Sequence, residues 1–157
     1  MNYESLLIEA DSKNLITKEK PLKAYNGRIK KNKILIREDM STTQKGCVLA
    51  EELGHYHTTV GNILDQSKTA NRKQELHARA WAYDKMIGLS GIINSYEHGC
   101  RSLHETAEFL NVTEEFLVEA INHYRNKYGI CTTIDNYIIY FEPALGVGKI
   151  ELNKIKI

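Results

Sequence analysis

The chain has 157 residues, of which 42% are hydrophobic and 26% charged, a composition that excludes an intrinsically disordered protein. Its formal net charge of +1 provides no overall attraction for nucleic acid or for an anionic membrane. A chain of this length can bury a core without disulfides or a structural metal, so we expect a single domain over residues 1–157.

The first half of the chain is predicted to contain two helices separated by a β-hairpin. Ile34 and Ile36 alternate toward one face and predict a strand after a turn at residues 31–32. Ser41 or Thr42 can cap the longer helix, and Gln44 completes a capping box with Ser41. The predicted elements are a helix over 3–10, a polar connection over 11–24, two strands over 25–37 and a helix over 41–57.

The second half is predicted to be mainly helical and to end in strands. Ser102 and Thr113 are suitable caps for two helix starts, and Gly129 is typical of a helix end. The predicted elements are a loop over 63–71, a helix over 71–87, a short helix near 91–97, helices over 102–110 and 113–129, and paired strands over 136–142 and 147–152. The whole pattern predicts an α+β fold, mainly helical, with a small antiparallel sheet.

The sequence EELGH at residues 51–55 is the most informative motif. Glu51 and His55 are four residues apart, so a helix places them on one face, where both can bind the same ion. Glu52 projects about 100° further around the helix, from where it can accept a proton from a water beside that ion. This is the geometry of the HExxH zinc helix with its first histidine replaced by glutamate, and it predicts a zincin-like active-site helix.

A catalytic zinc site needs a third protein ligand, and Glu75 is the best candidate. It follows His55 by 20 residues, near the start of an amphipathic helix that could return across the first. The alternative is that Glu75 is only an acidic residue favoured near a helix N-terminus. Likewise, an ExxxH pair also occurs on solvated helix faces. Such a face would not need Gly54, however, which costs about 1 kcal/mol relative to alanine.

The strings VLAEELGHYHT and KQELHARAWAYDK resemble the ImmA/IrrE family of metallo-endopeptidases, especially versions carried by prophages and mobile elements. The similarity continues through VTEEFLVEAINHYRNKYG and NYIIYFEPALG, so it covers residues 22–146. In that family a later glutamate is followed by an alanine and then by an aromatic–alanine pair. The matching residues here are Glu75, Ala78, Trp81 and Ala82. The resemblance implies that Glu52 is the catalytic base and that His55 and Glu75 bind the metal.

Position 51 departs from the family's pattern, because Glu51 replaces the first histidine. A carboxylate can still coordinate zinc, although its negative charge would make a bound water less acidic. Oxygen ligands also suit harder ions such as manganese. We therefore expect zinc, or alternatively manganese, bound by Glu51, His55 and Glu75.

Three functions remain open at this point. The resemblance implies a metal-dependent endopeptidase that cleaves a protein substrate, typically a helix-turn-helix repressor of a phage or mobile element, and so relieves repression. The alternative is a non-proteolytic anti-repressor that acts by binding and keeps only a degenerate or structural metal site. The third is a DNA-binding regulator that uses residues 102–126.

Residues 100–129 resemble a helix-turn-helix, but their charge argues against DNA as a partner. Residues 101–127 hold five acidic and three basic residues, and three of the acids lie near the start of the second helix, where base contacts are normally made. Phosphates would repel these acids, so we expect a packing module or a protein-docking surface. The basic run on the predicted hairpin is interpreted as a solvated edge that discourages strand pairing. Its residues are Arg28, Lys30, Lys31 and Lys33.

The remaining cysteines and histidines are expected to be structural. Cys47 should be a buried small residue, and His57 could reach the metal only if the helix unwound after His55. His104 and His123 are expected at the surface. The three widely spaced cysteines suit reduced thiols, and residues 1–13 look like neither a signal peptide nor a membrane anchor. We therefore expect a cytoplasmic protein without a membrane partner.

Overall fold

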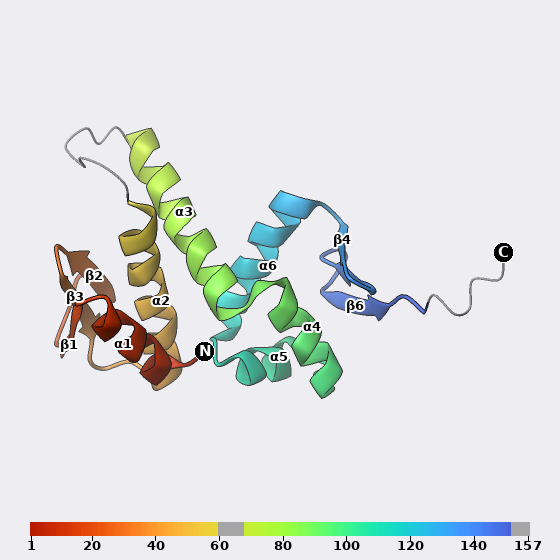
Figure 1. Cartoon of the computed structure of the whole chain (residues 1–157), viewed down its shortest axis with the longest axis horizontal. Coiled ribbons are helices and arrows are strands. Elements are labelled where there is room, and N and C mark those ends of the chain that lie inside the picture. Colours follow the sequence, from red (N-terminus) through yellow and green to blue (C-terminus); the bar gives the residue numbers. More distant parts are fainter. Residues whose placement is uncertain (60–67, 152–157) are drawn as a thin grey trace.

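The computed structural model describes residues 1–59 and 68–151, which form six helices and six strands (Figure 1). Most residues in regular elements are helical, which confirms the predicted, mainly helical α+β fold. The helices are α1 (Tyr3–Ser12), α2 (Thr42–Thr58), α3 (Lys68–Met86), α4 (Gly88–His98), α5 (Leu103–Leu110) and α6 (Glu114–Tyr128). The strands are β1 (Ile16–Lys20), β2 (Gly27–Lys30), β3 (Lys33–Arg37), β4 (Cys131–Ile134), β5 (Tyr137–Tyr140) and β6 (Gly146–Lys149).

Three predicted helix starts are confirmed by their capping hydrogen bonds. At α2 the Gln44 backbone N–H donates to the Ser41 hydroxyl at 3.1 Å, and the Ser41 N–H donates to the Gln44 side-chain oxygen at 3.0 Å. The side chains of Ser102 and Thr113 cap α5 and α6, each accepting from a backbone N–H three residues later. These bonds satisfy donors that a helix start leaves without partners, which is why local sequence predicts the position.

The N-terminal sheet has the strand order β1-β3-β2 and contains the predicted hairpin. β2 and β3 pair antiparallel with Lys30 opposite Lys33, so the turn falls at residues 31–32 as predicted. The prediction of a connection over 11–24 is wrong at β1, which pairs in parallel with β3. The sequence of β1, ITKEK, has no apolar alternation, because Thr17 and Glu19 occupy its inward positions. The hydrogen-bonding edge of β3 determines this strand, and local sequence does not reveal it.

The C-terminal sheet is antiparallel with the order β4-β5-β6. β5 and β6 confirm the predicted strand pair, with Tyr137 opposite Lys149. β4 was not predicted and pairs with β5 across a tight turn at Asp135, whose φ of 50° is a left-handed conformation that aspartate tolerates. The Asp135–Asn136 pair after a β-branched run was the signal that sequence reasoning missed.

The predicted starts of two helices, α3 and α4, differ from the structure. α3 begins at Lys68, so the end of the loop predicted over 63–71 is helical, and residues 60–67 lie outside the described residues. α4 is longer than the predicted short helix near 91–97, because it starts at Gly88, whose φ of 64° allows the chain to turn directly out of α3.

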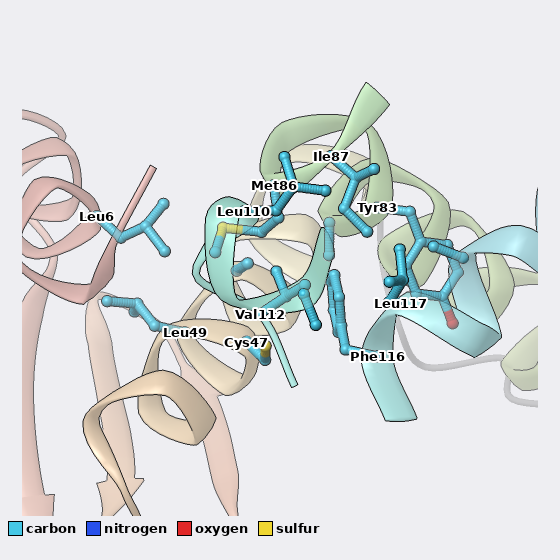
Figure 2. Packing of buried hydrophobic residues seen from close by; sticks show 14 of the residues in the cluster. Leu6, Cys47, Leu49, Tyr83, Met86, Ile87, Leu110, Val112, Phe116 and Leu117 are labelled. Carbon is cyan, nitrogen blue, oxygen red and sulfur yellow. The ribbon is translucent and has the colours of Figure 1, made fainter. Parts of the chain in front are cut away.

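The β1–β3 sheet lies on one side of α2 and α3 lies on the other (Figure 1). Leu49 and Leu53 of α2 are fully buried in one apolar cluster with Ile34 and Ile36 of β3. Figure 2 shows the same cluster extending past Cys47 toward α3, α5 and α6. The core therefore fixes α2, the helix of the EELGH motif, from several sides.

Within the described part of the chain, no helix is both long and apolar enough to cross a membrane.

Candidate metal centre between helices α2 and α3

Gly54 of the motif lies directly against the backbone of α3. A Cβ atom at this position would be 2.2 Å from the carbonyl oxygen of Ala78 and 2.9 Å from its carbonyl carbon, closer than side chains approach a backbone. Ala78 is itself fully buried. The absence of a side chain at Gly54 therefore sets the close approach of the two helices that carry the predicted ligands.

This approach brings two of the predicted ligands into contact. His55 Nε2 of α2 lies 3.1 Å from Glu75 Oε2 of α3, and both side chains remain partly exposed. The other carboxylate oxygen of Glu75 accepts a hydrogen bond from Arg79 Nε, also at 3.1 Å, one turn further along α3. His55 and Glu75 thus form an imidazole–carboxylate pair that is open to solvent.

Glu51 lies one turn before His55 on α2 and lines a cavity of about 270 Å³. Arg79 of α3 and Glu115 and Glu119 of α6 line the same cavity. Burial is the main cause that raises the pKa of Glu51 to about 7. The nearby carboxylates raise it further, while the charge of Arg79 lowers it. A half-buried carboxyl that is surrounded by other carboxylates readily binds a proton or a cation.

Glu52 is buried and faces the sheet rather than the cavity of Glu51. A Cβ atom on Gly27 of β2 would lie 3.3 Å from Glu52 Oε1, so the carboxylate lies against a strand position that has no side chain. Burial, followed by the charges of Glu51 and Glu75, raises the pKa of Glu52 to about 7. A hydrogen bond from the Ile29 backbone lowers it in part. A carboxyl with a pKa near neutrality is suited to proton transfer.

The donor set fits a divalent cation in its chemistry, but its members are not gathered around one point. Imidazole and carboxylate groups from two helices are typical zinc ligands, and carboxylates also suit manganese. Within residues 1–59 and 68–151, no three His, Cys, Asp or Glu side chains form a group that could hold an ion. Arg79 supplies the positive charge beside both Glu51 and Glu75. A cation that used both carboxylates would have to replace Arg79.

Arg79 and the acids of α6 are the parts of this site that sequence reasoning missed. Arg79 follows Glu75 by four residues, a helical spacing that could have indicated the pair. Glu119 is more distant in sequence, and its carboxylate accepts a hydrogen bond from the Tyr83 hydroxyl at 3.4 Å. The second helix of the helix-turn-helix-like segment therefore contacts α3, and some of its acids face the candidate site.

The neighbouring histidines and cysteine have structural surroundings, with one correction. His57 stacks on Trp81 with ring centroids 4.6 Å apart, so it faces away from the pair formed by His55 and Glu75. Cys47 is buried as predicted, and burial raises the pKa of its thiol to about 11. His104 is exposed as predicted, but the surface position predicted for His123 is wrong. His123 is half-buried beside Tyr83 and Tyr124, because α6 packs this side against α3.

Comparison with known proteins identifies one family. The model of the IrrE N-terminal-like domain, which describes a peptidase family, matches residues 10–122. The matched range includes both helices of the candidate site and begins in α1. No curated protein matches the chain significantly.

Proposed function

From the premise that this chain belongs to the metallopeptidase family of the IrrE N-terminal-like domain, we propose that it is a metal-dependent endopeptidase. As substrate we propose a helix-turn-helix repressor of a phage or mobile element, whose cleavage relieves repression. The observation that carries the proposal is the contact at 3.1 Å between His55 Nε2 and Glu75 Oε2, two side chains from adjacent helices.

The proposed metal ligands are Glu51, His55 and Glu75, and the proposed ion is zinc, with manganese as the alternative. When bound, the cation would lower the pKa of a water molecule and polarise the carbonyl of the scissile peptide bond. The chain's own contribution is to hold one imidazole and two carboxylates on the facing surfaces of α2 and α3. Arg79 would leave Glu75 as the ion binds.

Glu52 is proposed as the general base. It accepts a proton from the attacking water at its carboxylate and passes it to the amine of the departing peptide. Its position supports this role, because the side chain is buried and lies against the Gly27 backbone of β2. Such packing restricts the rotation of the carboxylate and keeps bulk water away from it.

Metal content tests the site independently of any substrate. We expect about one zinc or manganese per wild-type chain, purified without chelator or affinity tag and measured by mass spectrometry. His55→Ala should lose the metal. His77→Ala is the matched control, because His77 is exposed on α3, two residues from Glu75, and should keep the metal. Absence of metal from the wild-type protein, even after zinc or manganese is added at neutral pH, would refute the proposed site.

Cleavage tests the mechanism once the metal is established. Glu52→Gln preserves the shape of the side chain and removes the proton acceptor, so this variant should bind metal like wild type but fail to cleave the proposed repressor substrate. Loss of intact repressor on a denaturing gel is the measurement. Cleavage at the wild-type rate by Glu52→Gln would rule out the proposed base.

A second candidate function is a non-proteolytic anti-repressor that acts by contact. The observation in its favour is the hydrogen bond from Arg79 to Glu75, which satisfies the carboxylate without a metal. Under this alternative, wild type and Glu52→Gln would release repressor from its operator equally well and leave it uncleaved. Release that requires Glu52 would exclude this alternative.

A further inference from the structure

The outward face of the N-terminal sheet gathers basic side chains from all three of its strands. Successive residues of a strand point to opposite faces, and residues paired between strands share a face. Ile34 and Ile36 of β3 are buried, so their neighbours Lys33, Leu35 and Arg37 point outward. The residues of β1 and β2 that pair with these three positions lie on the same outward face. We call these cations the basic face: Lys18, Lys20, Arg28, Lys30, Lys33 and Arg37, with Lys31 at the hairpin turn.

Contacts of the inward residues confirm this assignment. Glu19 of β1 forms an ion pair with Lys45 of α2. Gly27 of β2 lies against the side chain of Val48, also on α2. Apart from Arg37, which is half-buried, the cations of the basic face are all exposed. Sequence reasoning placed four cations on the hairpin, and the unpredicted strand β1 adds Lys18 and Lys20 to the same surface.

The cations of the basic face have few anionic partners. In the part of the chain that the structure describes, Arg37 alone among them forms an ion pair, with Asp39. Lys30 is directly opposite Lys33, and Lys20 is opposite Arg37. Like charges in these positions destabilise a sheet. The protection of sheet edges by lysine can account for the cations of the edge strands β1 and β2, but not for Lys33 and Arg37 of the central strand β3.

A cavity of about 330 Å³ lies on this face beside an aromatic ring. The residues that line it include no acid: Tyr25, Arg28, Lys30, Lys31, Asn32, Lys33 and Leu35. The guanidinium carbon of Arg28 lies 5.8 Å from the centre of the Tyr25 ring. Cations around a partly exposed aromatic ring are the combination by which proteins that bind single-stranded nucleic acid hold phosphates and stack bases.

We propose that the basic face binds the phosphate backbone of single-stranded nucleic acid without reading its sequence. The chain's net charge is only +1, so the attraction is local and directed to this surface. An anionic membrane fits less well, because membrane-binding surfaces also insert apolar side chains. The most exposed large hydrophobic residue of these three strands is Ile16, and only 44% of its surface is exposed. The face is opposite to the side of the sheet that contacts Glu52, so binding leaves the candidate metal site open.

Fluorescence anisotropy with a labelled, mixed-sequence single strand of about 20 nucleotides tests this proposal. If four cations contact phosphates, the logarithm of the binding constant should fall with the logarithm of salt concentration at a slope of about −3. Affinity should then fall about fifty-fold between about 50 and 200 mM salt. The measurement requires neither metal nor proteolysis, so failure of the proposed function would not affect it.

Paired variants identify the surface. Lys18→Gln with Lys30→Gln removes two exposed cations from the outer strands, and the slope should fall to about −1.5. Arg101→Gln with Lys127→Gln removes the same charge from exposed positions elsewhere and should leave binding unchanged. Lys18→Arg with Lys30→Arg should bind like wild type. The proposal is overturned if wild type does not bind at about 50 mM salt, if the control pair weakens binding equally, or if phosphatidylserine vesicles bind and nucleic acid does not.

Discussion

Replacing Gly54 by alanine is expected to destabilise the protein, although alanine is the better helix former. The added Cβ would lie 2.2 Å from the Ala78 carbonyl oxygen and 2.9 Å from its carbonyl carbon. The obstacle is backbone, so α2 and α3 must separate by about 1 Å, and the cost should be near the upper end of overpacking, about 3 kcal/mol. The gain in helix propensity is about 1 kcal/mol, which leaves a net loss of about 2 kcal/mol.

Gly46 provides a matched control on the same helix. A Cβ there would meet the backbone nitrogen of Tyr3 at 3.5 Å, an ordinary contact, so Gly46→Ala should be neutral or stabilising by up to about 1 kcal/mol. Urea unfolding followed by circular dichroism gives both free energies of unfolding. The two substitutions should therefore differ by about 2 to 3 kcal/mol, with unchanged m-values.

The metal site provides a second readout of the same substitution. Separation of the helices would move His55 away from Glu75, so Gly54→Ala should also bind metal more weakly, whereas Gly46→Ala should not. Equal unfolding free energies for the two alanine variants would refute the reasoning, because they would mean that no close backbone approach exists at Gly54.

Three further predictions follow from the described residues. Cys131 is exposed, whereas burial raises the pKa of Cys47 to about 11. Iodoacetamide at about pH 8 should therefore modify Cys131 rapidly and Cys47 only after denaturation. Equal rates of modification, measured by peptide mass spectrometry, would contradict this prediction. Burial lowers the pKa of His123, so the unfolded state binds its proton more readily and the stability contribution is lost as pH falls below about 6.5. Wild type should therefore lose more unfolding free energy than His123→Gln when the pH falls from about 7.5 to 5.5, as measured by urea titrations. Equal losses in the two proteins would contradict a lowered pKa for His123. Asn111 ends α5 with a φ of 57°, a left-handed conformation that alanine adopts poorly. Asn111→Ala should therefore lower the free energy of unfolding by about 1 kcal/mol, whereas Asn111→Gly should not, as measured by thermal unfolding. Equal effects of the two substitutions would contradict a left-handed backbone at this position.

The sequence by itself determined the features that depend on neighbours within a few residues. The capping box at Ser41, the caps at Ser102 and Thr113 and the hairpin turn after Lys30 are all satisfied by local hydrogen bonds. The spacing of Glu51 and His55 also follows directly from the helical repeat. The family resemblance was recognisable for a similar reason, because each of the strings that carry it is short and contiguous.

Only the tertiary structure decided which distant groups meet. It placed Glu75 in contact with His55, turned Glu52 toward β2 and put Arg79 in the position of a competing cation. It also made a strand of the polar segment β1, which completes the basic face. These outcomes depend on helix approach and strand register, and both are determined by contacts between residues distant in sequence, such as Gly54 with Ala78. A sequence pattern shows which side chains a chain carries, whereas the packing of the whole core decides which of them share one site.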